Sequence, residues 1–239
     1  MPGGIEAALD AAGYTVAVRG GGWIRVTAPD GTVRRFHGRA RFQAWAETGR
    51  RRAWRGGFDG AAEPTNPGPA AWGAWLDTPW GDRAWEAGMA IGFTSNNVAE
   101  WTGLIRLLEA ARARGVRALS AIGDSQLVVY QFQGHYAIRQ PHLAALADQA
   151  WALARGLALE LNWVPRDRNA RADALSKAAL RAASPTRFPP DRLERLDRHR
   201  WVAHGTADYR VDTRARTCTC PAFTRGRRPC KHLAAALLE

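Results

Sequence analysis

Hydrophobic and polar residues alternate in three short runs near the start of the chain. These runs are residues 14–18, 23–27 and 32–36. A period of two is typical of β-strands, and Ala28-Pro29-Asp30-Gly31 between the last two runs favours a turn. Amphipathic stretches at residues 5–12 and 41–48 predict a helix on each side of the strands. We therefore expect residues 1–50 to form a small α+β unit.

The middle of the chain has three strand-like runs followed by alternating helical and strand-like segments. The expected strands are residues 53–60, 70–76, 85–93, 118–123 and 157–164, and the expected helices are residues 98–113, 126–132, 142–155 and 170–183. Apolar side chains recur on one face of the first of these helices, which Asn96 or Asn97 can cap. This order predicts an α/β domain over residues 53–183, with a mixed five-stranded sheet and helices on its faces.

The last part of the chain changes in character. Residues 184–200 are rich in Pro, Arg and Asp and are expected to be a linker before a short terminal unit, residues 201–239. No apolar run approaches the length of about 18 residues that a membrane-spanning helix needs. The first ten residues have no basic segment followed by an apolar one, so no secretory signal is expected. A cytoplasmic protein that does not enter membranes is the expectation.

Charge is distributed unevenly along the chain. The net charge of +12 lies in the flanks: residues 1–55 hold 10 Arg against 4 acids, residues 56–183 are neutral, and residues 184–239 hold 11 Arg and 1 Lys against 6 acids. Basic flanks favour a polyanionic partner such as nucleic acid. Compositional bias is the alternative explanation, because only 2 Lys accompany 32 Arg. Residues 1–50 could therefore bind nucleic acid or contact a protein, and the sequence leaves both open.

Four acidic residues fall where the predicted elements begin or end. Asp59 and Asp124 end strands, Glu100 lies near the start of a helix, and Asp173 opens the last helix. Mg²⁺ prefers a few carboxylate oxygens and water in octahedral geometry. Two such ions about 4 Å apart can activate water and stabilise a leaving oxygen. Four converging carboxylates would repel one another without metal, so this pattern predicts a metal-dependent site.

The segments that contain these acids carry a family resemblance. FDGAAEPTNPGPAAWGAWL, TSNNVAEWTGLIRLLEA, IGDSQLVVYQ and NWVPRDRNARADALSKAA occur in this order and are similar to the four motifs of type I ribonuclease H, the ribonuclease HI-like family. The resemblance covers roughly residues 53–183 and implies the mixed five-stranded sheet of that fold.

The resemblance also implies a role for each residue. Asp59 would bridge two Mg²⁺ (or Mn²⁺) ions, Glu100 and Asp124 would complete one of them, and Asp173 would bind the other. Positions that contact an RNA–DNA hybrid through its minor groove are matched by Asn66, Asn97 and Gln126. Side-chain amides there could read 2′-hydroxyl groups, which distinguish RNA from DNA. Turn formation or helix capping is the other explanation for these amides.

Two features depart from the family pattern. Many members carry a histidine in the loop before the last acid, but here that loop is Pro165-Arg166-Asp167-Arg168-Asn169, so we expect Arg166 or Arg168 to face the scissile phosphate instead. Some members carry a basic protrusion that is replaced here by the short, nearly uncharged residues 133–140. We expect the basic flanks to supply the missing electrostatic attraction to a duplex.

All three cysteines of the chain lie in the terminal unit. Cys218, Cys220, Cys230 and His232 form a C-x-C-x9-C-x-H pattern. Thiolate and imidazole ligands select Zn²⁺ and close a tetrahedral structural site. With YRVD before the first cysteine and KHLAAALL around the histidine, residues 201–239 resemble the SWIM zinc finger. Arg225, Arg227, Arg228 and Lys231 near the ligands favour contact with nucleic acid, although modules of this kind are also linked to protein partners.

The resemblance thus implies an endonuclease that hydrolyses the RNA strand of RNA–DNA hybrids with two metal ions and leaves 5′-phosphate ends. The zinc finger would aid nucleic-acid binding. One alternative is a non-catalytic nucleic-acid-binding protein of the same fold, but such a protein would gain nothing from clustered acids that face phosphates. Another alternative is a nuclease of the same chemistry that acts on a different nucleic acid.

Overall fold

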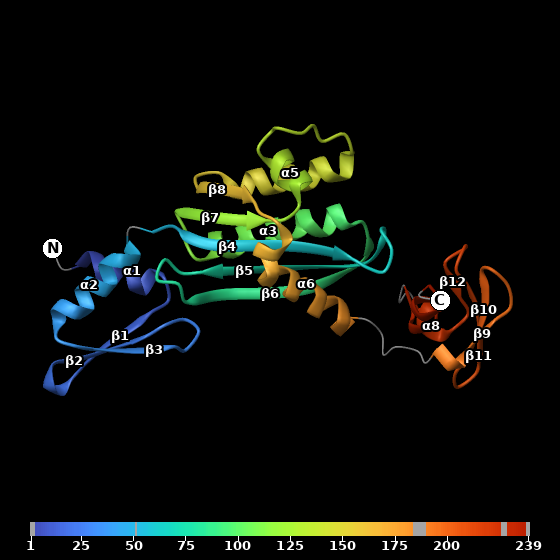
Figure 1. Cartoon of the computed structure of the whole chain (residues 1–239), viewed down its shortest axis with the longest axis horizontal. Coiled ribbons are helices and arrows are strands. Elements are labelled where there is room, and N and C mark those ends of the chain that lie inside the picture. The colour runs from blue at the N-terminus through green and yellow to red at the C-terminus, as the bar shows by residue number, and fades with distance from the viewer. Residues whose placement is uncertain (1–2, 51, 184–189, 226–228, 238–239) are drawn as a thin grey trace.

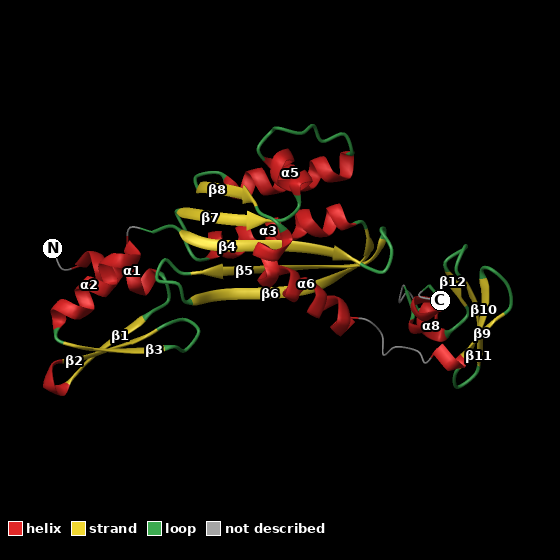
Figure 2. Ribbon diagram, in the orientation of Figure 1, coloured by secondary structure: helices red, strands yellow, loops and turns green. Residues whose placement is uncertain are grey.

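The computed structural model describes residues 3–50, 52–183, 190–225 and 229–237. Along the chain it contains an N-terminal α+β unit, a central α/β domain and a C-terminal unit, each built on its own sheet (Figures 1 and 2). None of the helices in these ranges is long and apolar enough to cross a lipid bilayer.

The central domain is built on a mixed sheet of five strands. These strands are β4 (Trp54–Ala62), β5 (Gly68–Asp77), β6 (Arg83–Thr94), β7 (Ala118–Gly123) and β8 (Ala158–Trp163), in the order β6-β5-β4-β7-β8. The first three strands pair in antiparallel fashion, and β7 pairs in parallel with both β4 and β8. The predicted α/β fold with a mixed five-stranded sheet is confirmed.

Four helices and one 3-10 turn complete the central domain. They are α3 (Asn96–Ala113), α4 (Gln126–Phe132), α5 (Pro141–Ala154), the 3-10 turn Arg166–Asn169 and α6 (Ala170–Ala183). Trp101 and Leu104 of α3 are fully buried in the main core, and α5 packs on α3. The predicted capping by Asn96 or Asn97 is wrong: α3 begins two residues earlier than expected, and the Ser95 hydroxyl accepts a hydrogen bond from the Val98 N–H.

Glycines allow the helices to approach the sheet closely. A Cβ at Gly60 of β4 would overlap the backbone of Glu100 in α3, and a Cβ at Gly73 of β5 would overlap the backbone of α6 at Ser176. Asp59 lies opposite Gly73 in the β-ladder, and consecutive residues of a strand point to opposite faces. Consequently α3 and α6 cover opposite faces of the sheet at the strand that carries Asp59 (Figure 1).

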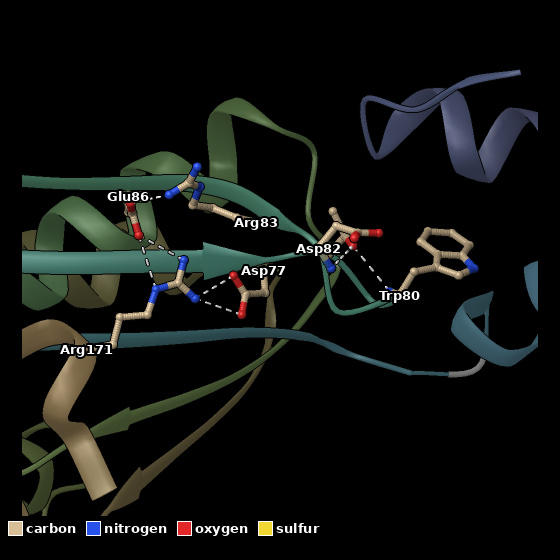
Figure 3. Close-up of polar contacts among 7 residues, drawn as sticks. Asp77, Trp80, Asp82, Arg83, Glu86 and Arg171 are labelled. Carbon is tan, nitrogen blue, oxygen red and sulfur yellow. Dashed lines mark hydrogen bonds and ion pairs between the residues drawn. The ribbon is translucent and has the colours of Figure 1, made fainter. Parts of the chain in front are cut away.

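Helix α6 is fixed to the sheet by an arginine near its start. Figure 3 shows Arg171 between Asp77 at the end of β5 and Glu86 of β6. Its guanidinium donates to both oxygens of Asp77, at 2.8 and 2.9 Å, and to Glu86 at 3.0 and 3.2 Å. It also lies 4.6 Å from the centre of the Trp75 ring. This clamp sets the orientation of the helix that carries Asp173.

The N-terminal unit is a three-stranded antiparallel sheet with two helices. Its elements are α1 (Gly3–Ala11), β1 (Thr15–Arg19), the 3-10 turn Gly20–Gly22, β2 (Trp23–Thr27), β3 (Val33–His37) and α2 (Arg39–Arg50). The strands lie in the order β1-β2-β3. Leu9, Tyr14, Val26, Phe42 and Ala46 form a buried core between the helices and one face of this sheet.

The N-terminal unit docks on the turn between β5 and β6. The buried Asp82 of that turn accepts a hydrogen bond from the Tyr14 hydroxyl at 2.5 Å and two from the Arg34 guanidinium at 2.7 and 2.8 Å. Trp80 projects from the same turn (Figure 3), and its indole N–H donates to the Ala46 carbonyl at 3.0 Å. A neutral phenol and a bidentate arginine together satisfy the buried carboxylate, which ties the two units together.

The C-terminal unit is a four-stranded sheet with two short helices. Its elements are β9 (Leu193–Arg195), β10 (Arg200–His204), β11 (Asp208–Asp212), β12 (Thr217–Cys218), α7 (Pro221–Thr224) and α8 (Lys231–Ala236). The expected linker at residues 184–200 is therefore wrong for its second half. Residues 193–195 pair with β10, and Leu193 packs on the core of this unit. The Pro- and Arg-rich composition concealed this short strand; residues 184–189 lie outside the described residues.

We expect Gly49→Ala to weaken the docking of the N-terminal unit, because the new methyl group would overlap the Trp80 ring. Overpacking of this kind costs about 1–3 kcal/mol, so the melting temperature should fall by several degrees. Gly4→Ala is the matched control on α1, where the methyl group would meet only the Arg50 side chain at 3.7 Å. Calorimetry would measure both, and equal melting temperatures for the two variants would contradict the described packing.

Candidate active site

Three of the four predicted acids meet in one cluster. Asp59 from β4, Glu100 from α3 and Asp124 after β7 each place a carboxylate oxygen within 4.8 Å of the others. Asp59 is 2% exposed, Glu100 is 4% exposed and Asp124 is half-buried. Segments 24 to 65 residues apart in the sequence thus place carboxylates together where the parallel pairing of β4 with β7 ends. Asp59 lies within β4, three residues before its last residue, and not at the end of the strand as expected.

Two polar side chains that the sequence reasoning did not single out hold these acids. The Ser176 hydroxyl of α6 donates to Asp59. The buried Asn169 amide donates to Asp124 at 2.7 Å and to the Phe58 carbonyl at 2.8 Å. Asn169, Asp173 and Ser176 are spaced by four and three residues, which places them on one face at the start of α6. This helical spacing relative to Asp173 is the feature of the sequence from which both side chains could have been predicted.

Burial and mutual repulsion disfavour the ionised form of these carboxylates when no cation is bound. Burial raises the pKa of Asp59 to about 7, and the negative charges of Asp124 and Asp173 add to the effect. Burial, and then the charge of Asp59, also raise the pKa of Glu100 well above its ordinary value. The Oε2 atom of Glu100 is buried without a hydrogen-bond partner among the described residues. A hard divalent cation would satisfy this oxygen and neutralise the cluster, so the donor set fits such an ion.

Asp173 is not part of this cluster of three. One of its oxygens accepts from the Arg166 guanidinium at 2.6 and 3.0 Å, and the other lies 2.8 Å from the Lys177 ammonium. Burial opposes ionisation, but the hydrogen bonds from Lys177 and Arg166 prevail and lower the pKa of Asp173. Arg166, expected to contact substrate, is therefore paired with an acid and remains exposed at the edge of the site.

Of the three amides expected to contact substrate, Asn97 and Gln126 lie at the starts of helices, and Asn66 lies in the loop between β4 and β5. The Asn66 side-chain carbonyl accepts from the Asn96 N–H at 2.9 Å, so it also holds its loop against the start of α3. Asn97 is half-buried as the second residue of α3. Gln126 is exposed as the first residue of α4, two residues after Asp124. Asn66 and Asn97 thus lie at the start of the helix that carries Glu100, and Gln126 lies close to Asp124 in the chain.

The predicted zinc ligands form a second, separate cluster. Ligand atoms of Cys218, Cys220, Cys230 and His232 all lie within 4.8 Å of one another, and all four residues are buried. The Cys218 sulfur lies 3.8 Å from Nδ1 of His232. A hydrogen bond with Cys218 lowers the pKa of Cys230 to about 5, which favours the thiolate form that binds metal. Three sulfurs and one nitrogen at these separations fit a tetrahedral zinc ion.

The C-terminal unit carries basic residues near the predicted zinc ligands and contacts the central domain. Arg225 follows α7 and Lys231 begins α8, whereas Arg227 and Arg228 lie outside the described residues. The Arg216 guanidinium lies 4.2 Å from the centre of the Phe93 ring in β6. This contact places the turn between β11 and β12 beside the end of β6.

Comparisons with known proteins match two parts of the chain. The model of the family described as reverse transcriptase-like matches residues 57–179, and the SWIM zinc finger model matches residues 208–239. The chain is 41% identical over 121 residues to the bifunctional protein Rv2228c of Mycobacterium tuberculosis, covering 50% of this chain and 33% of that protein. It is 42% identical over 124 residues to ribonuclease HI of Halobacterium salinarum, covering 52% of this chain and 62% of that protein. The chain thus spans about a third of the length of the mycobacterial relative.

Solved structures are similar over the same region. The N-terminal RNase H domain of Rv2228c, solved as a fusion with maltose binding protein, is 39% identical with a TM-score of 0.53, covering 55% of this chain and 95% of that one. A ribonuclease H1 designated LC11, solved in complex with an RNA/DNA hybrid, is 33% identical with a TM-score of 0.51, covering 54% of this chain and 98% of that one.

We expect Mg²⁺ to stabilise the protein more at pH 8 than at pH 6. The pKa of Asp59 is raised to about 7 in the folded protein, above its value of about 3.9 in the unfolded chain. The folded state therefore keeps its proton longer, and the metal-free protein loses stability as pH rises from about 4 to about 7. Above pH 7 the ionised cluster binds the cation without releasing that proton. Differential scanning fluorimetry would measure the shift, and Asp59→Asn should reduce its pH dependence, with the raised pKa of Glu100 accounting for what remains.

We expect His232→Ala to lose zinc that the unchanged protein retains. Both proteins would be dialysed against EDTA, and their zinc content would be measured by mass spectrometry. His204→Ala is the matched control, because His204 is an exposed histidine of the same unit that pairs with Asp208 and Glu194 instead. Equal zinc retention by the His232 and His204 variants would contradict the assignment.

Proposed function

The chain belongs to the reverse transcriptase-like family of ribonuclease H-like domains, and on that premise we propose that it is a ribonuclease H. It would hydrolyse the RNA strand of RNA–DNA hybrids and leave 5′-phosphate and 3′-hydroxyl ends. The observation that carries this proposal is the convergence of Asp59, Glu100 and Asp124, with one oxygen of Glu100 buried and unpartnered among the described residues. A protein that only binds nucleic acid has no use for such a cluster.

Four side chains would hold the metal. Asp59 would be shared by two Mg²⁺ or Mn²⁺ ions, Glu100 and Asp124 would complete one site, and Asp173 would contribute to the other. When bound, such ions supply an activated water and stabilise the departing oxygen. The three clustered carboxylates lie in segments of the chain that the packing of α3 and α6 fixes, so they need little rearrangement.

The neighbouring side chains orient these ligands. Ser176 holds one oxygen of Asp59, which leaves the other oxygen for a cation. Asn169 does the same for Asp124. Arg166 and Lys177 hold Asp173 in its ionised form, and these cations compete with metal for its oxygens. Arg166 is exposed beside the cluster, so it would exchange its contact with Asp173 for the substrate phosphate.

Substrate selection would come from the amides of Asn66, Asn97 and Gln126. They lie at the starts of α3 and α4 or on the loop that holds α3, beside the carboxylates. Amide groups can donate to and accept from 2′-hydroxyl groups, which only the RNA strand offers. The similarity to a ribonuclease H1 solved with an RNA/DNA hybrid supports the same class of substrate here.

The zinc unit would assist in binding nucleic acid. Four protein side chains would occupy all four positions around the zinc ion, which is typical of a structural zinc site rather than a catalytic one. The central domain is neutral, whereas residues 184–239 carry a net charge of +6. Arg216 holds this basic unit against β6, beside the loop that contains Asn66. A protein partner for this unit is the alternative.

We expect Asp59→Asn to abolish metal-dependent cleavage, because the shared ligand loses its charge. The full chain would be incubated with an RNA–DNA hybrid, duplex RNA, duplex DNA and single strands, with Mg²⁺ and with EDTA. Only the hybrid should be cut, only with Mg²⁺, and the rate should fall by at least about a hundredfold in the variant, since electrostatic groups of this kind contribute about that much.

Asp148→Asn is the matched control for this assay, because Asp148 is an exposed acid on α5 outside both clusters. It should cut the hybrid at the unchanged rate. Cleavage that survives Asp59→Asn would contradict the proposed centre. If duplex RNA or DNA were cut at a similar rate, the proposed metal-dependent chemistry would stand, but the proposed substrate would be wrong.

A further inference from the structure

The N-terminal sheet has one face that its helices do not cover. The register of the three strands sets Arg19, Trp23 and His37 in one row, and Ala17, Arg25 and Arg35 in the next row on the same face. We call these two rows the outer face. The inner face carries the buried Ile24 and Val26, which pack against α1 and α2.

The outer face combines positive charge with an exposed aromatic ring. Arg19, Arg25 and Arg35 are all exposed, and Trp23 is 46% exposed. The Trp23 ring meets His37 edge-on, with ring centres 5.0 Å apart. The acids of this unit lie on the helices and in the turn before β3: they are Glu6, Asp10, Asp30 and Glu47. None of the residues in the two rows is acidic.

The positions of two arginines on the outer face are unfavourable for the stability of the sheet. Arg25 and Arg35 are direct cross-strand partners, and like charges in that position destabilise a sheet. Among the described residues neither forms an ion pair, whereas Arg34 on the inner face is paired with Asp82. Two facing arginines beside an unburied tryptophan therefore point to a ligand that neutralises charge and covers an aromatic ring.

We propose that the outer face binds an unpaired nucleic-acid strand. Trp23 would stack on a base, and Arg19, Arg25 and Arg35 would contact the phosphates. Unpaired bases expose flat faces that aromatic side chains can cover, whereas the bases of a duplex are already stacked on one another. A strand of negative charge at regular spacing also complements arginines set in adjacent rows.

The docking described above fixes this face relative to the carboxylate cluster. Arg34, which precedes Arg35 in β3, is one of the side chains that bind Asp82 of the β5–β6 turn. A strand on the outer face would therefore be held at a set position with respect to the central domain. The inference itself does not depend on cleavage, because it concerns binding to residues outside the proposed active site.

The test uses the full chain and a fluorescent oligothymidylate of about twelve nucleotides, within the site sizes of single-strand binders. Fluorescence anisotropy without added Mg²⁺ would give the dissociation constant. We expect Trp23→Ala to weaken binding at least about fivefold, since stacking contributes about 1–3 kcal/mol per base, and Trp23→Phe to retain most of it. Duplex DNA of the same length should bind equally well to both variants and to the unchanged chain.

Arginine variants test the charge component. The double variant Arg25→Ala, Arg35→Ala should flatten the dependence of log affinity on log salt by about 1.4, because each phosphate contact on a single strand contributes about 0.7. Arg41→Ala is the control for lost charge, since Arg41 is exposed on α2 and outside the outer face. It should change neither affinity nor slope.

Three results would overturn the inference. The first is unchanged binding of the oligothymidylate by Trp23→Ala. The second is a loss from Arg41→Ala as large as the loss from the double variant Arg25→Ala, Arg35→Ala, which would indicate general charge attraction. The third is a loss of duplex binding in Trp23→Ala as large as the loss of single-strand binding. Melting temperatures close to that of the unchanged chain would establish that each variant is folded.

Discussion

Electrostatic repulsion within a buried cluster of carboxylates is the constraint on which the central domain depends. Asp59, Glu100 and Asp124 come from three separate elements, and their oxygens lie within 4.8 Å of one another. Only close packing can hold them there. Gly60 and Gly73 admit helices to both faces of the sheet at this point, and the Arg171 clamp fixes the second helix. The rigidity of the scaffold thus maintains an arrangement that the charges alone would disperse, and a bound cation would relieve that strain.

Much of this domain could be predicted from the sequence, because its signals are local. Periodicity located the five strands and four helices, and the motif order located the acids, since strand ends and helix starts converge in a mixed sheet. The bounds of β7, α4 and α6 agree with the expected ranges. Strands β4 and β5 extend beyond the expected ranges to Ala62, Gly68 and Asp77, and the weak strand propensity of these residue types concealed the true length of both strands.

The contacts that the sequence did not reveal are those between distant segments. Asn169 and Ser176 look like ordinary polar residues until folding brings them to Asp124 and Asp59. The pairing of Asp173 with Arg166 and Lys177 depends on rotamers, which spacing does not determine. Strand β9 is only three residues long and gains its structure from its partner β10. Such features depend on tertiary packing rather than on propensity.

The contacts of the Asp82 carboxylate also determine whether the N-terminal unit can be treated as an independent module. Tyr14 and Arg34 belong to the N-terminal unit, but the acid that satisfies them belongs to a turn of the central domain, and Trp80 of that turn completes the aromatic core around Tyr14. The two units therefore meet at residue 50 in the sequence, but their side chains pack against one another across this boundary. Transplanting residues 3–50 onto another catalytic scaffold would succeed only if residues 78–82 were transplanted with them.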